Sequence, residues 1–124
     1  MEQDLVENEL SRKIIGLIFE VFKQLGYGLP ERIYQRAFEQ LLIKNQISYS
    51  KEKYGKILFD GQEVGKYFVD FVIEDKIAVE LKVRNEIYQT HLNQLLNYLK
   101  SEKLKIGLLL AISKNGVLIK RLVN

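Results

Sequence analysis

The chain lacks cysteine, and this absence excludes several kinds of chemistry at once. With no Cys among 124 residues, disulfides, thiolate zinc sites, iron–sulfur clusters and cysteine nucleophiles are all ruled out. Histidine is almost as scarce, because His91 is the only one in the chain. A single imidazole leaves little room for serine–histidine catalysis or for a histidine-rich metal site. Oxygen ligands and lysine are the reactive groups that remain.

Long hydrophobic runs are also missing. The longest, such as Ile106 to Ile112, fall far short of the roughly 20 residues that span a bilayer. The acidic start, Met1-Glu2-Gln3-Asp4, is unlike a signal peptide. We therefore expect no membrane partner and a cytoplasmic location.

What is present fits a single globular domain over residues 1–124. The chain is 47% apolar and 28% charged, and it has no internal repeat, low-complexity segment or linker. Its 19 Lys and Arg against 16 Asp and Glu give a net charge of +3. This charge fits a polyanionic partner without requiring one, and a homo-oligomer is left open.

Apolar residues at helical spacing predict three helices. They run from about Leu10 to Leu25 with a polar lead before it and Gly26 as C-cap, from Pro30 to Asn45, and from Ile87 to Lys100 with Thr90 as N-cap if that helix begins late.

Alternating or continuous apolar runs predict the strands. These are Ile47 to Lys53, Tyr54 to Phe59, Glu63 to Ile73, Ile77 to Val83, Lys105 to Ile112 and Val117 to Val123. Asp60-Gly61 is a strong hairpin signal. The order ααβββ(β)αββ predicts an α/β (α+β) fold with helices covering a mixed central β-sheet.

The strands ending at Ile73 and starting at Ile77 form the most unusual part of the sequence. Their short polar link, Glu74-Asp75-Lys76, predicts a hairpin. A three-residue turn sets Ile73 opposite Ile77, and the same register sets Asp70 opposite Glu80 with Cβ atoms about 5 Å apart.

Two facing acids destabilise a sheet unless something compensates their charge. Because side chains alternate between faces, Lys82 lies on the same face as Glu80. A divalent cation between Asp70 and Glu80 would replace repulsion with coordination. The sequence therefore predicts a metal site at this hairpin.

Asp70 followed by Glu80-Leu81-Lys82 resembles the signature of the PD-(D/E)xK nuclease superfamily, with Val69 where a proline is common. Gly28-Leu29-Pro30-Glu31-Arg32-Ile33-Tyr34 resembles the pattern that names the GxxExxY family of that superfamily. Phe22 and Tyr27 depart from its usual His and Pro. The resemblance extends to the last strand and implies a restriction-endonuclease-like core.

The resemblance also implies roles for individual residues. Asp70, Glu80 and the Leu81 carbonyl would hold Mg²⁺ or Mn²⁺, Lys82 would position or activate the attacking water, and Glu31 would assist at the same site. Gln94 and Tyr98 are similar to a Gln-x-x-x-Tyr motif of related nucleases and would support substrate binding. His91 and Tyr34 are further candidates for substrate contacts.

Each of these side chains also has a purely structural interpretation. The alternatives are a solvated strand face for Asp70 and Glu80, neutralisation of Glu80 by Lys82, the helix dipole for Glu31, core packing for Tyr34, a polar helix seam for Gln94 and Tyr98, and ordinary hydrogen bonding for His91.

Two functions follow from this sequence. The first is a Mg²⁺- or Mn²⁺-dependent nuclease acting on DNA or RNA. The second is an inactive nuclease-like domain that binds nucleic acid or protein, because folds outlast functions. The intact set of Asp70, Glu80 and Lys82 favours the first.

Overall fold

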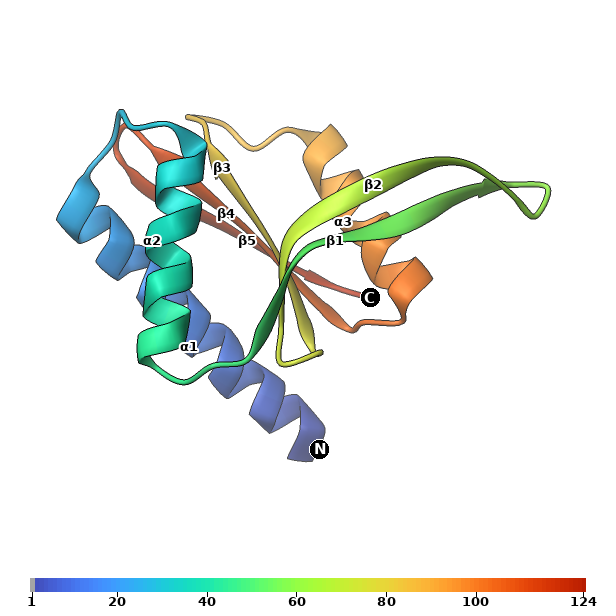
Figure 1. Cartoon of the computed structure of the whole chain (residues 1–124), viewed down its shortest axis with the longest axis horizontal. Helices are drawn as coiled ribbons and strands as arrows, with labels where there is room; N and C mark the ends of the chain where they lie inside the picture. The colour runs from blue at the N-terminus through green and yellow to red at the C-terminus, as the bar shows by residue number, and fades with distance from the viewer. Residues whose placement is uncertain (1) are drawn as a thin grey trace.

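The computed structural model describes residues 2–124, with side chains from Glu7 onward. Three helices and five strands follow one another in the predicted order (Figure 1). They are α1 (Glu2–Leu25), α2 (Glu31–Lys44), β1 (Tyr49–Phe59), β2 (Gln62–Ile73), β3 (Ile77–Val83), α3 (Gln89–Glu102), β4 (Ile106–Ser113) and β5 (Gly116–Val123).

The five strands form one mixed sheet in the order β1-β2-β3-β4-β5. β3 and β4 are parallel and are joined through α3, whereas the other neighbours are antiparallel. All eight residues of β4 are buried, as expected for a central strand covered on both faces. The fold class predicted from the sequence is confirmed.

The helices divide between the two faces of this sheet (Figure 1). α1 and α2 pack on one face around Ile14, Ile18 and Phe38, and the larger of the two cores lies there. α3 packs on the other face through Leu95 and Leu99. Among residues 2–124, no helix is both long and apolar enough to cross a membrane.

Two local predictions were wrong, and the strand that the predicted order left optional merges with its neighbour. Residues 49–59 form one strand, because β1 pairs with β2 along its length and absorbs a positive φ of 52° at Glu52. The polar lead is helical from Glu2, since neither Pro nor Gly interrupts the chain before Gly16. Thr90 lies inside α3, whose N-cap is Tyr88.

The turns were better predicted. Asp60 and Gly61 both have positive φ, 50° and 76°, as a two-residue type I′ hairpin requires. Gly26 ends α1 with φ 68°, and its N–H donates to the Phe22 carbonyl at 2.8 Å.

The β1–β2 hairpin leaves the sheet partway along its length. β2 pairs with β3 only from Ile73↔Ile77 to Phe71↔Val79, although β1 and β2 stay paired almost to Asp60. Beyond Phe71 the two strands bend away as a two-stranded arm (Figure 1). The split between β2 and β3 lies where Asp70 faces Glu80.

The loop between α1 and α2 is fixed by a buried tyrosine. The Tyr34 hydroxyl donates to the Gly26 carbonyl at 2.6 Å and accepts from the Leu29 N–H at 3.2 Å. Its side chain is fully buried. Tyr34, a residue of α2, therefore fixes the loop that leads into that helix.

Tyr34→Phe is expected to lower the free energy of unfolding by about 1–2 kcal/mol, because it removes both bonds and keeps the ring. Urea unfolding monitored by circular dichroism measures this change. Tyr27→Phe is the matched control, since Tyr27 is 44% exposed. Equal stabilities of the two variants would contradict the role given to the Tyr34 hydroxyl.

Candidate active site

The two acids predicted to face each other do so at the split between β2 and β3. The predicted pairing of Ile73 with Ile77 is confirmed, and its continuation sets Asp70 opposite Glu80. At this point hydrogen bonds from side chains take the place of the backbone hydrogen bonds between β2 and β3. The Asp70 N–H donates to Glu80 Oε1 at 2.9 Å, and the Leu81 N–H donates to Asp70 Oδ2 at 2.7 Å. Each acid thus binds the backbone of the opposite strand.

The position of the two carboxyl groups raises the pKa of each. Burial, reinforced by the charge of Asp70, raises the pKa of Glu80 to about 8, and Lys82 only partly opposes this shift. Burial also raises the pKa of Asp70, against the Leu81 N–H and Lys82, which lower it. The pair therefore lacks sufficient positive charge of its own.

Lys82 supplies one positive charge on the same face. Its Nζ lies 3.6 Å from Glu80 Oε2, and 25% of its side chain is exposed against 12% for Glu80. The predicted grouping of Asp70, Glu80 and Lys82 is therefore present in the structure. The ammonium group is close enough to interact with Glu80 and still open to solvent.

Glu31 and His91 reach the same place from two helices. Glu31 begins α2, and its Oε1 accepts from the Val83 N–H at 3.2 Å. His91 lies in the first turn of α3. Burial and then the charges of Lys82 and Arg84 lower the pKa of His91, whereas Glu31 opposes this shift. Glu31 is thus bonded to the carboxyl end of β3, and its charge and that of Lys82 both act on His91.

The imidazole of His91 keeps one polar atom without a partner. Its Nδ1 is buried, and it has no hydrogen bond within residues 2–124. Such an atom costs free energy unless a ligand or water engages it. His91 therefore remains a candidate for contact with substrate.

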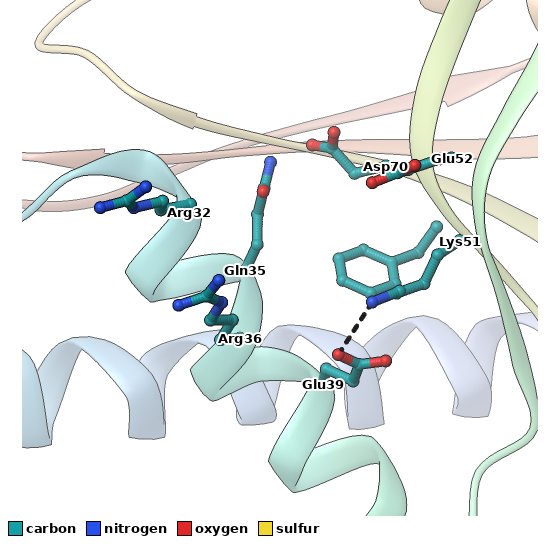
Figure 2. Close-up of a pocket in the computed structure, with 8 residues that line it drawn as sticks. Arg32, Gln35, Arg36, Glu39, Lys51, Glu52 and Asp70 are labelled. Carbon is teal, nitrogen blue, oxygen red and sulfur yellow. Dashed lines mark hydrogen bonds and ion pairs between the residues drawn. The ribbon is translucent and has the colours of Figure 1, made fainter.

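Gln35 is a site residue that the sequence analysis missed. Its side chain points toward Asp70 (Figure 2), and hydrogen bonding from it lowers the pKa of Asp70. Its one sequence signal is weak: Gln35 follows Glu31 by four residues and shares its helix face.

A pocket of about 250 Å³ opens beside Asp70 (Figure 2). Arg32 and Arg36, both exposed on α2, form part of its rim together with Lys51. Lys51 pairs with Glu39 at 3.2 Å. Neither arginine has an ion pair within the described residues, so both charges are available to an anion.

The remaining predicted residues lie in different surroundings. The Tyr34 hydroxyl is used in the α1–α2 loop, which favours its structural interpretation. Tyr98 is buried against Tyr67, with ring centroids 6.1 Å apart, and burial raises its pKa to about 12. Gln94 is exposed. Supporting roles for Gln94 and Tyr98 stay predictions.

No group of three or more His, Asp or Glu side chains within the described residues is arranged to hold a metal ion. Asp70 and Glu80 nevertheless fit a hard cation. Each uses one oxygen for a backbone N–H and retains a second. Mg²⁺ commonly binds one or two carboxylates and takes its other ligands from water and phosphate. Burial raises the pKa of both acids, and a bound cation would oppose this effect by favouring their ionised forms.

A mixed sheet with helices on both faces, and with acids and a lysine where two central strands part, defines a restriction-endonuclease-like protein. The sequence matches the PD-(D/E)XK nuclease superfamily over residues 8–122, and the chain belongs to that superfamily. Membership points to nuclease activity, and nucleases of this superfamily generally use divalent metal ions.

A solved structure has the same fold. The crystal structure of SSO0001 superposes with a TM-score of 0.60 at 21% sequence identity, over 75% of this chain and 49% of the other. The chain thus spans about half the length of that protein. No curated protein matches the sequence.

The acids predict how stability depends on pH in the absence of metal. The folded pKa of Glu80, about 8, exceeds its ordinary 4.5. Between these values the folded chain keeps a proton that the unfolded chain releases, so stability falls as pH rises from about 5 to 8. Glu80→Gln removes this loss and should stabilise the protein by roughly 1–3 kcal/mol at pH 8.

Urea unfolding in EDTA at several pH values measures the difference. Asp75→Asn is the control, because Asp75 is an exposed acid in the turn of the same hairpin. Parallel pH profiles for the wild type and Glu80→Gln would rule out the proposed electrostatic cost.

Proposed function

We propose that this protein is a Mg²⁺- or Mn²⁺-dependent nuclease that hydrolyses phosphodiester bonds in DNA or RNA. The observation that carries the proposal is the pair of partly buried carboxyl groups facing each other at the β2–β3 split with Lys82 beside them. We also propose that residues 1–124 form one domain of the GxxExxY group and that it acts in the cytoplasm.

In this proposal Asp70, Glu80 and the Leu81 carbonyl hold the ion. When bound, the ion polarises the scissile phosphate and offsets charge that grows in the transition state. Asp70 and Glu80 are held in place by each other's strands, so they need little reorganisation to bind it. Gln35 orients Asp70 from α2.

Lys82 positions the attacking water, and its positive charge stabilises the hydroxide that forms when this water loses a proton to solvent. Its ammonium lies beside Glu80 and remains partly open to solvent, where a water molecule can reach it. Glu31, tied to the Val83 N–H, orients water at the same end of β3. His91 is neutral near pH 7, because its pKa is lowered, and its free Nδ1 can bond substrate or water.

The arginines of α2 supply charge for the substrate backbone. Arg32 and Arg36 line the pocket beside Asp70 and carry no ion pairs within the described chain. Arginine suits phosphate recognition because its planar guanidinium offers paired donors. They would hold phosphates next to the one that is cleaved.

One observation favours the second candidate function, a nucleic-acid-binding module without turnover. The described residues offer two acids and no third within a compact ligand group. Such a module would bind nucleic acid with a steep salt dependence and leave it intact.

Cleavage assays separate the two. Asp70→Asn and Glu80→Gln keep an oxygen acceptor for the backbone N–H groups and remove the charge, and each should lower kcat/KM by at least roughly 100-fold. Lys82→Ala should cause a loss of similar order. The assays use labelled single- and double-stranded DNA and RNA with Mg²⁺ or Mn²⁺, and EDTA should abolish activity.

Two controls match these variants. Asp75→Asn removes an exposed acid from the same hairpin, and Lys120→Ala removes an exposed lysine from β5. Cleavage at equal rates by all the proteins would refute the site. Tight, salt-sensitive binding with no turnover by the wild type would support the module instead.

A further inference from the structure

The β1–β2 arm exposes apolar side chains that a monomer in water would normally cover. Of the large apolar residues exposed anywhere in the described chain, nearly half lie on this arm. They are Tyr54, Ile57, Leu58, Phe59, Val64 and Phe68. Clusters of this kind mark interaction sites.

One face of the arm is already occupied. The Tyr67 hydroxyl donates to the Asn97 carbonyl of α3 at 2.7 Å and lies 2.9 Å from Ser101 Oγ. Gly55 pairs with Tyr67 across the strands, and a Cβ there would collide with the Tyr67 ring. This face packs on α3, and the next residues in each strand must point the other way.

The opposite, open face carries an aromatic pair. Tyr54 and Phe68 are cross-strand partners, with ring centroids 5.9 Å apart. They are 44% and 60% exposed, respectively. Nothing in the described chain covers the greater part of the Phe68 ring.

The next pair along the open face is Lys56 and Lys66, which lie directly opposite each other. Like charges at facing positions destabilise a sheet, and an anion between them would remove the cost. Lys66 Nζ lies 4.6 Å from the centroid of the Tyr54 ring. Aromatic and positively charged groups thus form one continuous surface.

This surface leads to the acids. Phe68 precedes Asp70 by two residues on β2, so their side chains leave the same side of the strand about 7 Å apart. The sequence of groups along the open face is therefore Asp70, then the Tyr54–Phe68 pair, then the Lys56–Lys66 pair.

We propose that the open face of the arm binds a single-stranded segment of DNA or RNA that leads into the active site. Unpaired bases stack on Phe68 and Tyr54, and phosphates bind Lys56 and Lys66. Stacking on aromatic side chains beside basic groups is how proteins hold single strands, whereas a duplex keeps its base faces inside. The inference rests on the proposed function and deepens it.

A second copy of this chain fits the surface less well. Most homo-oligomers pair the same patch with itself. A symmetric contact centred on the Lys56–Lys66 pair would set that pair against its own copy and bring four ammonium groups together. A nucleic acid strand brings the missing negative charge.

Binding of fluorescently labelled oligothymidine and of a duplex of equal length, measured by anisotropy in EDTA, tests the inference without cleavage. The wild type should prefer the single strand. The double variant Tyr54→Ala, Phe68→Ala should weaken single-strand binding roughly 10- to 100-fold. Phe19→Ala is the matched control, because Phe19 is an aromatic residue 49% exposed on α1.

The lysine pair has its own readout. Lys56→Gln with Lys66→Gln should reduce the slope of log affinity against log salt by about 1.4, the value for two phosphate contacts on a single strand. Circular dichroism checks that each variant is folded. Cleavage of single-stranded substrate by the aromatic variant should show a raised KM.

Several outcomes would overturn the inference. These are no single-strand binding by the wild type, an equal loss in Phe19→Ala, or a concentration-dependent dimer in sedimentation that the aromatic variant abolishes. An unchanged KM in the aromatic variant would also refute single-strand binding by the arm, and it would leave the proposed nuclease activity unaffected. Binding that depends on the arm but leads to no cleavage would support single-strand binding by the arm and refute the proposed nuclease activity.

Discussion

The structure depends on the exchange of hydrogen bonds between Asp70 and Glu80. Where β2 leaves β3, two backbone N–H groups lose their ladder partners and would be left buried without an acceptor. Each acid supplies that acceptor to the other strand. The same two groups that form the candidate metal site therefore also supply the acceptors where the sheet divides, and burial at this point raises the pKa of both.

This arrangement explains why the site lies where it does. Once β2 has bent away, the carboxyl end of β3 is open on one side, and α2 and α3 both begin beside it (Figure 1). Glu31 and His91 reach the opening from those helix starts. The residues come from three parts of the chain, and each lies on a helix or a strand.

Much of this could be predicted from the sequence, because it depends on local patterns. The turn Glu74-Asp75-Lys76 sets the register of the hairpin, and period-two alternation then groups Glu80 with Lys82. The order of the elements follows from changes of hydrophobic period. Family resemblance added Glu31, which no pattern within the hairpin could have linked to Val83.

The rest depends on contacts between distant residues. Apolar residues run almost without interruption from Tyr67 to Ile73, so the sequence pattern cannot reveal that β2 changes partners near Phe71. Tyr54 to Phe59 resembled a separate strand, because no local pattern shows that β1 pairs with β2 along its whole length. Gln35 was missed because an amide on a helix face has no distinctive meaning until Asp70 is known to lie opposite.

The pattern from Gly28 to Tyr34 has a mechanical meaning beyond its use as a family signature. Gly28 has φ 115°, which side-chain-bearing residues rarely adopt, Glu31 is bonded to the end of β3, and Tyr34 is bonded back to the loop. Because Tyr34 follows Glu31 by three positions, Glu31 reaches the end of β3 while Tyr34 bonds to the loop between α1 and α2. The first turn of α2 is therefore attached at two points, and these attachments fix both the orientation of the helix and the position of Glu31 relative to the sheet.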